Sequence, residues 1–137
     1  MTKINATKDE FARLYNGLVE VKDLKSKKFA LVTSKNMAII RDALQHVEDL
    51  NRPTKEFIEI AQKINAIANK NEEGAEEQIK KIEEANAEII QTRKDQVKKV
   101  SEILKEELEL ELTLITEDVL PEDITADQIT NILKIIK

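Results

Sequence analysis

Residues 75–116, AEEQIKKIEEANAEIIQTRKDQVKKVSEILKEELELELTLIT, decide the fold because the spacing of their apolar side chains changes once along the stretch. Up to residue 104 the apolar residues return to one face of an α-helix, and from residue 108 they alternate with polar residues, as on a β-strand. The helical set is Ile79, Ile82, Ile89, Val97, Val100 and Leu104, and the alternating set is Leu108, Leu110, Leu112 and Leu114. The sequence therefore predicts a long helix over about 75–107 and a strand over about 107–116.

A strand needs a partner, because a single strand leaves its backbone hydrogen-bonding groups unpaired. Two segments of the chain are candidates: Thr2–Asn5, which is short and extended in character, and Phe29–Thr33, which contains β-branched residues. The third candidate is the same strand of a second copy, which would give a dimer by sheet extension. The sequence leaves these three alternatives open.

The segment before the long helix predicts a second helix antiparallel to it. Thr54 can cap this helix, and apolar residues follow at helical spacing: Phe57, Ile60, Ala61, Ile64 and Ile67. The turn 71–74 (NEEG) is short, so the two helices should form an antiparallel hairpin. Polar residues (Asn86, Arg93 and Gln96) interrupt the apolar face of the long helix. We therefore expect the interface that this face forms with its neighbour to be only partly buried.

Two shorter helical segments carry the same N-terminal signal at opposite ends of the chain. In a capping box, a Thr hydroxyl accepts from the amide three residues on, and a Glu or Gln there reaches back. Thr7 and Glu10 fit this pattern before a helix to about residue 21, in which Gly17 marks close packing or an early end. Thr125 and Gln128 fit it before a short C-terminal helix that ends near residue 136.

The middle segment, residues 29–50, is ambiguous at its start. Residues 29–33 could form a short strand, but an apolar stripe that includes Asn36 continues through six turns, so we favour a helix. Pro53 ends it, since proline disfavours helix at the preceding residue. The predicted fold class is mainly α (α+β): a long antiparallel helical hairpin, shorter helices and a small β element near residues 107–116. We expect residues 1–137 to form one helical domain with a C-terminal strand and short helix.

The composition excludes several kinds of chemistry. Cysteine is absent and histidine occurs once, so there is no disulfide framework, cysteine-based zinc site or cysteine nucleophile. The two glycines are too far apart for a glycine-rich phosphate loop. We expect a protein that is not an enzyme, with no catalytic residue, no cofactor and no metal. No apolar run is long enough to span a bilayer, so we expect no membrane association.

Charge divides unevenly along the chain, whose net charge is −5. Residues 1–70 contain 13 basic and 9 acidic residues, whereas residues 71–137 contain 9 basic and 18 acidic residues. The two halves either attract each other, within one chain or between subunits, or one end binds a partner. Candidate partner-binding residues are Lys27, Lys28, Arg41, Arg93, Glu107, Glu109 and Glu111. The basic stretch 22–35 contains no aromatic residue except Phe29, and the whole chain is acidic, so we expect no direct binding of nucleic acid.

Three stretches resemble a family of small tailed-bacteriophage proteins of unknown function. They are the run from Leu14 to Asn36, the acidic turn 71–74, and the tail from the glutamate-rich helix end to Ile129. The resemblance implies a phage-encoded protein in the host cytoplasm or the virion, and it transfers no active site.

Three functions remain open after this. The first is a non-enzymatic interaction protein, homo-oligomeric and acting through protein contacts in virion assembly. The second is a phage inhibitor that binds and blocks a host defence protein. The third is a binder of small anionic ligands, with arginines at an oligomer interface.

Overall fold

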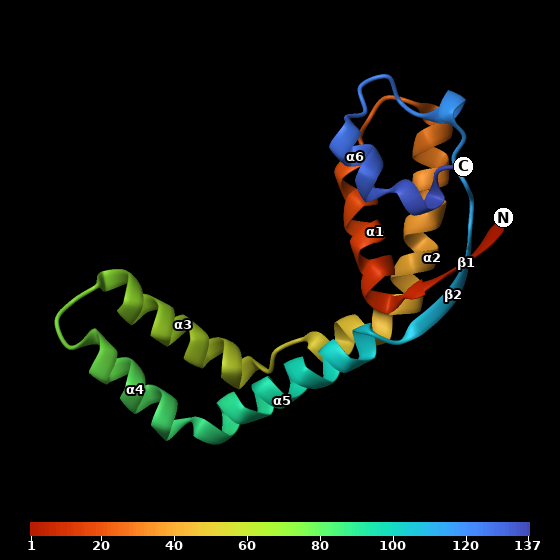
Figure 1. The fold of residues 1–137 in the computed structure, drawn as a ribbon. Helices are drawn as coiled ribbons and strands as arrows, with labels where there is room; N and C mark the ends of the chain where they lie inside the picture. Colours follow the sequence, from red (N-terminus) through yellow and green to blue (C-terminus); the bar gives the residue numbers. More distant parts are fainter. The chain divides into compact units, whose positions relative to one another are not determined.

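The computed structural model describes all 137 residues and divides them into two compact units. The first unit is Met1–Val47 with Ile103–Lys137, and the second is Glu48–Glu102. The elements, in chain order (Figure 1), are β1 (Thr2–Thr7), α1 (Lys8–Val21), α2 (Lys27–Asn51), α3 (Lys55–Lys70), α4 (Ala75–Ala85), α5 (Ala87–Leu104), β2 (Glu107–Leu112), the 3-10 turn Glu117–Val119, α6 (Ala126–Asn131) and the 3-10 turn Leu133–Ile135. The fold is thus mainly α with a small β element, as predicted. That the two units fold together as one domain stays a prediction.

Both predicted capping boxes are present in the first unit. Thr7 Oγ1 accepts from the Glu10 amide at 3.1 Å, and Glu10 Oε1 accepts from the Thr7 amide at 3.2 Å. The same exchange joins Thr125 and Gln128, at 3.2 and 3.0 Å. These bonds satisfy amides that would otherwise lack partners at the first turn, so α1 and α6 begin where the sequence predicts.

The two strands pair with each other in an antiparallel ladder. Thr2 lies opposite Leu112 and Thr7 opposite Glu107, so the Thr2–Asn5 candidate is confirmed as the partner within the chain. The alternative partner at Phe29–Thr33 is wrong, because these residues belong to α2, as the continuous apolar stripe favoured. The strand also ends at Leu112, earlier than the predicted residue 116.

The early end of β2 has a physical cause in α2. Asn36, which is fully buried, donates from Nδ2 to the Thr113 carbonyl oxygen and accepts at Oδ1 from the Thr113 amide, both at 2.9 Å. The side-chain amide thus takes both backbone groups of the residue after the strand. Further on, Ile115 forms a parallel bridge with Ile136, which ties the last residues to the same unit.

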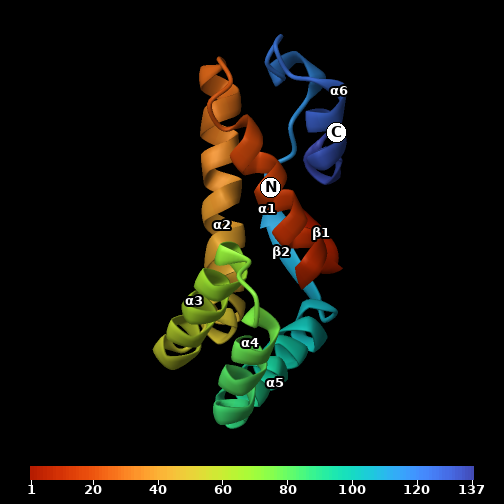
Figure 2. The same ribbon diagram turned by 90° about the vertical axis from the view of Figure 1, so that its left-hand side faces the viewer.

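The core of the first unit is aliphatic with two phenylalanines, and its residues come in part from α1, α2 and β2, which Figure 2 labels. Its fully buried members include Phe11, Leu18, Phe29, Ile40, Leu112, Ile115, Ile132 and Ile135. Gly17 allows α6 to approach α1: a Cβ atom there would lie 2.9 Å from the Asn131 carbonyl oxygen. Of the two predicted roles of Gly17, close packing is therefore confirmed.

The second unit contains the predicted helical hairpin, but its second arm is not one helix. Asn86 separates α4 from α5, with φ −120° and ψ 26°. Its side-chain amide and its backbone amide both donate to the Ile82 carbonyl oxygen, at 2.9 and 3.1 Å. An asparagine that bonds its own backbone competes with the helical ladder, which explains why the single helix predicted over 75–107 is wrong. The turn between α3 and α4 contains Asn71 and Gly74 in left-handed conformations.

Candidate functional site

The helical hairpin of the second unit buries little of its apolar surface. Among the residues of α3 only Ile60 is buried, and α4 buries none. The other members of the predicted α3 stripe, Phe57, Ala61, Ile64 and Ile67, are half-buried. A unit of this size has too little interior to enclose all its aliphatic side chains. The hairpin therefore presents apolar surface to its surroundings.

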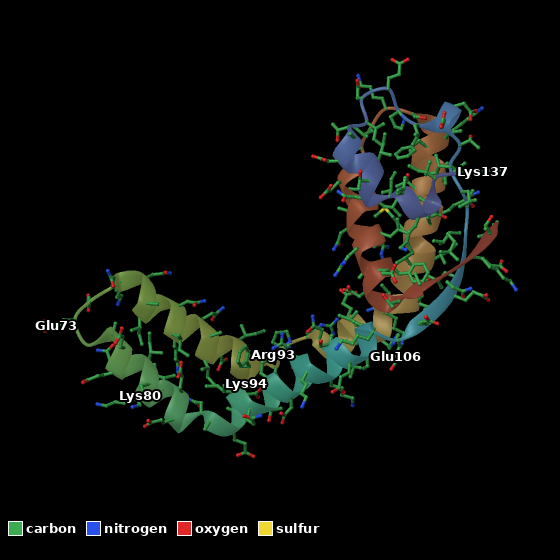
Figure 3. The ribbon with its side chains drawn as sticks, viewed as in Figure 1. Glu73, Lys80, Arg93, Lys94, Glu106 and Lys137 are labelled. Atoms are coloured by element: carbon green, nitrogen blue, oxygen red, sulfur yellow. The ribbon has the colours of Figure 1, made fainter.

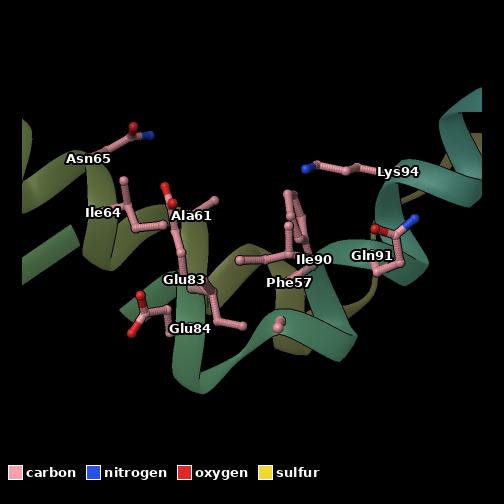
Figure 4. Close-up of a pocket in the computed structure, with 11 residues that line it drawn as sticks. Phe57, Ala61, Ile64, Asn65, Glu83, Glu84, Ile90, Gln91 and Lys94 are labelled. Carbon is pink, nitrogen blue, oxygen red and sulfur yellow. The ribbon is translucent and has the colours of Figure 1, made fainter. Parts of the chain in front are cut away.

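This surface forms a groove of about 550 Å³ between α3 and the α4–α5 arm. Its lining residues are Phe57, Ile60, Ala61, Ile64, Asn65, Glu83, Glu84, Ala87, Ile90, Gln91 and Lys94 (Figure 4). Because the helix is interrupted at Asn86, both the last turn of α4 and the first two turns of α5 contribute residues to the lining of the groove. The floor is apolar and the rim is polar, which is the usual composition of a site that binds a protein or another large ligand.

The charged rim residues lie at different ends of the groove. Glu83 and Glu84 come from the end of α4, beside Ile64, whereas Lys94 comes from α5 near Phe57 (Figure 4). All three are exposed, and none forms an ion pair within the chain. The groove thus has one acidic and one basic end.

Arg93, a predicted partner-binding residue, is engaged next to this groove rather than in it. Its Nη1 donates to the Asn51 carbonyl oxygen at 2.8 Å and to Gln96 Oε1 at 2.9 Å, and its guanidinium lies over the Phe57 ring, 5.8 Å from the centroid. Gln96 in turn donates to the carbonyl oxygens of Leu50 and Arg52. The last carbonyls of a helix lack intrahelical partners, so these two side chains cap the end of α2. Figure 3 shows Arg93 and Lys94 at adjacent positions of α5.

Arg41, the second predicted arginine, is bound to an aromatic residue of the first unit. Its Nε and Nη2 donate to the Tyr15 hydroxyl at 3.2 and 3.1 Å, and its guanidinium lies 5.8 Å from the centre of that ring. Arg52 forms an ion pair with Asp49 at 3.2 Å. Each guanidinium therefore has a separate partner, and no observation favours the small-anion hypothesis.

Lys27 and Lys28 occupy the first turn of α2 and are exposed. A hydrogen bond from the Thr116 side chain, together with one from its own backbone, holds the pKa of Asp118 below its ordinary value, and the charge of Lys28 adds to this effect. Lys8 Nζ lies 2.9 Å from Glu106 Oε2 and 3.3 Å from the lone histidine, His46. Part of the charge asymmetry is thus satisfied within the chain.

The three strand glutamates lie together on the exposed face of the ladder. Glu107 is opposite Thr7, Glu109 is opposite Asn5, and Glu111 is opposite Lys3, so one cation faces three carboxylates. The leucines between them are more buried, and Leu112 is fully enclosed. This acidic face remains a candidate surface for a partner, as predicted, without further geometric support.

The groove is the feature that sequence reasoning missed. Its α3 wall was predicted as a helical face, but the carboxylates and the lysine of its rim were not singled out. No family model, no curated protein and no solved structure matches the chain. No group of three or more potential metal-binding side chains occurs in the structure, and none of its helices combines the length and apolarity that crossing a membrane requires.

Proposed function

We propose that the protein is a non-enzymatic interaction protein that binds a protein partner through the groove of the helical hairpin. The observation that supports this proposal is the half-buried apolar floor between α3 and α5, which water covers in the isolated chain. Covering such a floor with a partner helix is favourable by about 25 cal/mol for each Å² of apolar surface removed from water. The groove suits recognition of a helix, in which apolar side chains of the partner, three or four residues apart, enter an apolar groove.

The resemblance to small tailed-bacteriophage proteins adds origin and setting to this proposal. On that basis the chain is phage-encoded, works in the host cytoplasm or the virion, and contributes protein contacts to virion assembly. The proposal requires no cofactor.

The test places a photo-crosslinking amino acid at Asn65, which lines the groove, in cells that express the chain. The matched control carries it at Glu59, which is exposed on α3 and does not line the groove. We expect a protein adduct from position 65 and none from position 59. If position 65 yields no protein adduct, the groove is not a protein-binding site and the proposal fails. An adduct with a host defence protein, rather than with a virion protein or this chain, would overturn the assembly role alone.

A further inference from the structure

The groove has the charge pattern of a surface that can pair with itself. In a two-fold interface, each residue i of one copy contacts residue j of the other, and j contacts i in return. Two such grooves meet face to face with their ends exchanged when the two-fold axis lies in the interface and runs across the length of the groove; an axis along the groove would bring like charges together. The Lys94 end of one copy then faces the Glu83 and Glu84 end of the other, and both ends are paired at once.

The apolar surface beside the groove extends the same faces. Ile58 is 42% exposed and shares a side of α3 with Ala61 and Asn65, at spacings of three and seven residues. Val97 is 45% exposed and continues the side of α5 that holds Ile90 and Lys94. A small ligand within the groove would leave both in water, whereas a second hairpin could cover them.

The surface area of the chain is large enough to supply an interface. The chain exposes 9613 Å². The relation between surface and mass gives about 5,000 Å² for a compact body the size of the first unit and about 3,700 Å² for the second. Even with the two units counted as separate bodies, the chain exposes about 900 Å² more than this relation predicts, and a standard interface buries about 800 Å² on each partner.

We infer that the occupant of the groove is the groove of a second copy of this chain, so that two hairpins form a two-fold symmetric helical bundle. This inference rests on the proposed function, and it names the partner. The helices would pack as in other four-helix assemblies, with isoleucines inside and the Lys94 to Glu83 and Glu84 pairs at the rim.

Charge exchange tests this arrangement directly. The first variant is Lys94→Glu, the second is Glu83→Lys with Glu84→Lys, and the third combines all three changes. All three positions are exposed and unpaired within the chain, so the fold should persist, which circular dichroism verifies. The control is Lys99→Glu, which makes the same charge change on α5 at an exposed position that does not line the groove.

Sedimentation equilibrium on the full chain should give twice the chain mass of 15.7 kDa. Because each reversed contact occurs twice, each partial exchange should weaken dimerisation about 10- to 100-fold, and the combined exchange should restore it to within about 3-fold of the original. The control should change it less than about 3-fold.

A monomeric wild-type chain at about 100 μM, or partial exchanges that weaken dimerisation no more than the control does, would overturn the inference. A combined variant as weak as either partial exchange would also overturn it. If the chain is monomeric but a different protein is crosslinked at Asn65, the inference fails and the proposed function stands. If nothing is crosslinked there, both fail.

Discussion

Replacement of Asn36 by alanine tests the contact that holds α2 to the chain after β2. The substitution removes two hydrogen bonds of 2.9 Å and leaves the amide and the carbonyl of Thr113 without their partner. Each unsatisfied group costs about 1–2 kcal/mol, toward the lower end of the usual range because Thr113 is only half-buried. Alanine is the better helix former by about 0.5 kcal/mol, which offsets part of this cost. The free energy of unfolding should therefore fall by about 1.5–3.5 kcal/mol.

Urea unfolding followed by circular dichroism measures this change, and the slope against urea should stay the same, since the surface exposed on unfolding is unchanged. The matched control is Asn16→Ala, the same chemical change at an exposed position of α1. There only the helix propensity differs, so stability should rise by about 0.5 kcal/mol. If Asn36→Ala is no more destabilising than Asn16→Ala, the side chain of Asn36 does not stabilise the end of β2 and the reasoning fails.

Three further substitutions test contacts elsewhere. Gly17→Ala should lower the melting temperature although alanine favours helix, because its Cβ would lie 2.9 Å from the Asn131 carbonyl oxygen; a raised melting temperature contradicts this close approach. Glu10→Gln keeps the cap but loses the ion pair with Lys134, whose hydrogen bond is the largest cause that holds the pKa of Glu10 below its ordinary value of 4.5. A lowered pKa stabilises the fold above the ordinary value and loses this effect as the pH falls, so the difference in urea midpoint between wild type and variant should shrink from about pH 6 to about pH 3; a constant difference contradicts it. Gln96→Ala leaves two carbonyls at the end of α2 unpaired, and urea unfolding should show a loss of about 1 kcal/mol; no loss would mean that water replaces the bonds.

The parts of the fold that the sequence predicts correctly depend on signals within a few residues. The alternation from Leu108 to Leu112 produces a strand with one buried face, and the Thr7 and Thr125 boxes begin helices where predicted. The helix at 29–50 follows from its unbroken stripe. In each case the residues that identify the element are also the ones that pack or cap it. The prediction therefore does not depend on residues far away in the sequence.

The break at Asn86 shows where such signals become insufficient. The isoleucines on either side, Ile82 and Ile89, are seven residues apart and fit one continuous helix. The competing interaction is a side-chain amide that bonds the Ile82 carbonyl oxygen, and asparagine can do this or face solvent within a helix. Apolar spacing does not distinguish the two states. The sequence therefore predicts a polar position within one helix at residue 86, whereas in the structure α4 ends at Ala85.

The groove was missed for a related reason. Arg93 and Gln96 interrupt the apolar face of α5. Their spacing alone indicates either a partly solvent-exposed helix interface or a binding site. Their side chains donate hydrogen bonds to backbone carbonyls at the end of α2, 42 to 46 residues earlier in the chain. A sequence pattern that spans only a few residues does not reveal contacts at that separation. Arg93 and Gln96 thus bond the end of α2, and the charged residue that lines the groove from α5 is Lys94, opposite in charge to Glu83 and Glu84 at the other end. Both polar breaks therefore stabilise the end of α2, and only their contacts with residues 50–52 show this role.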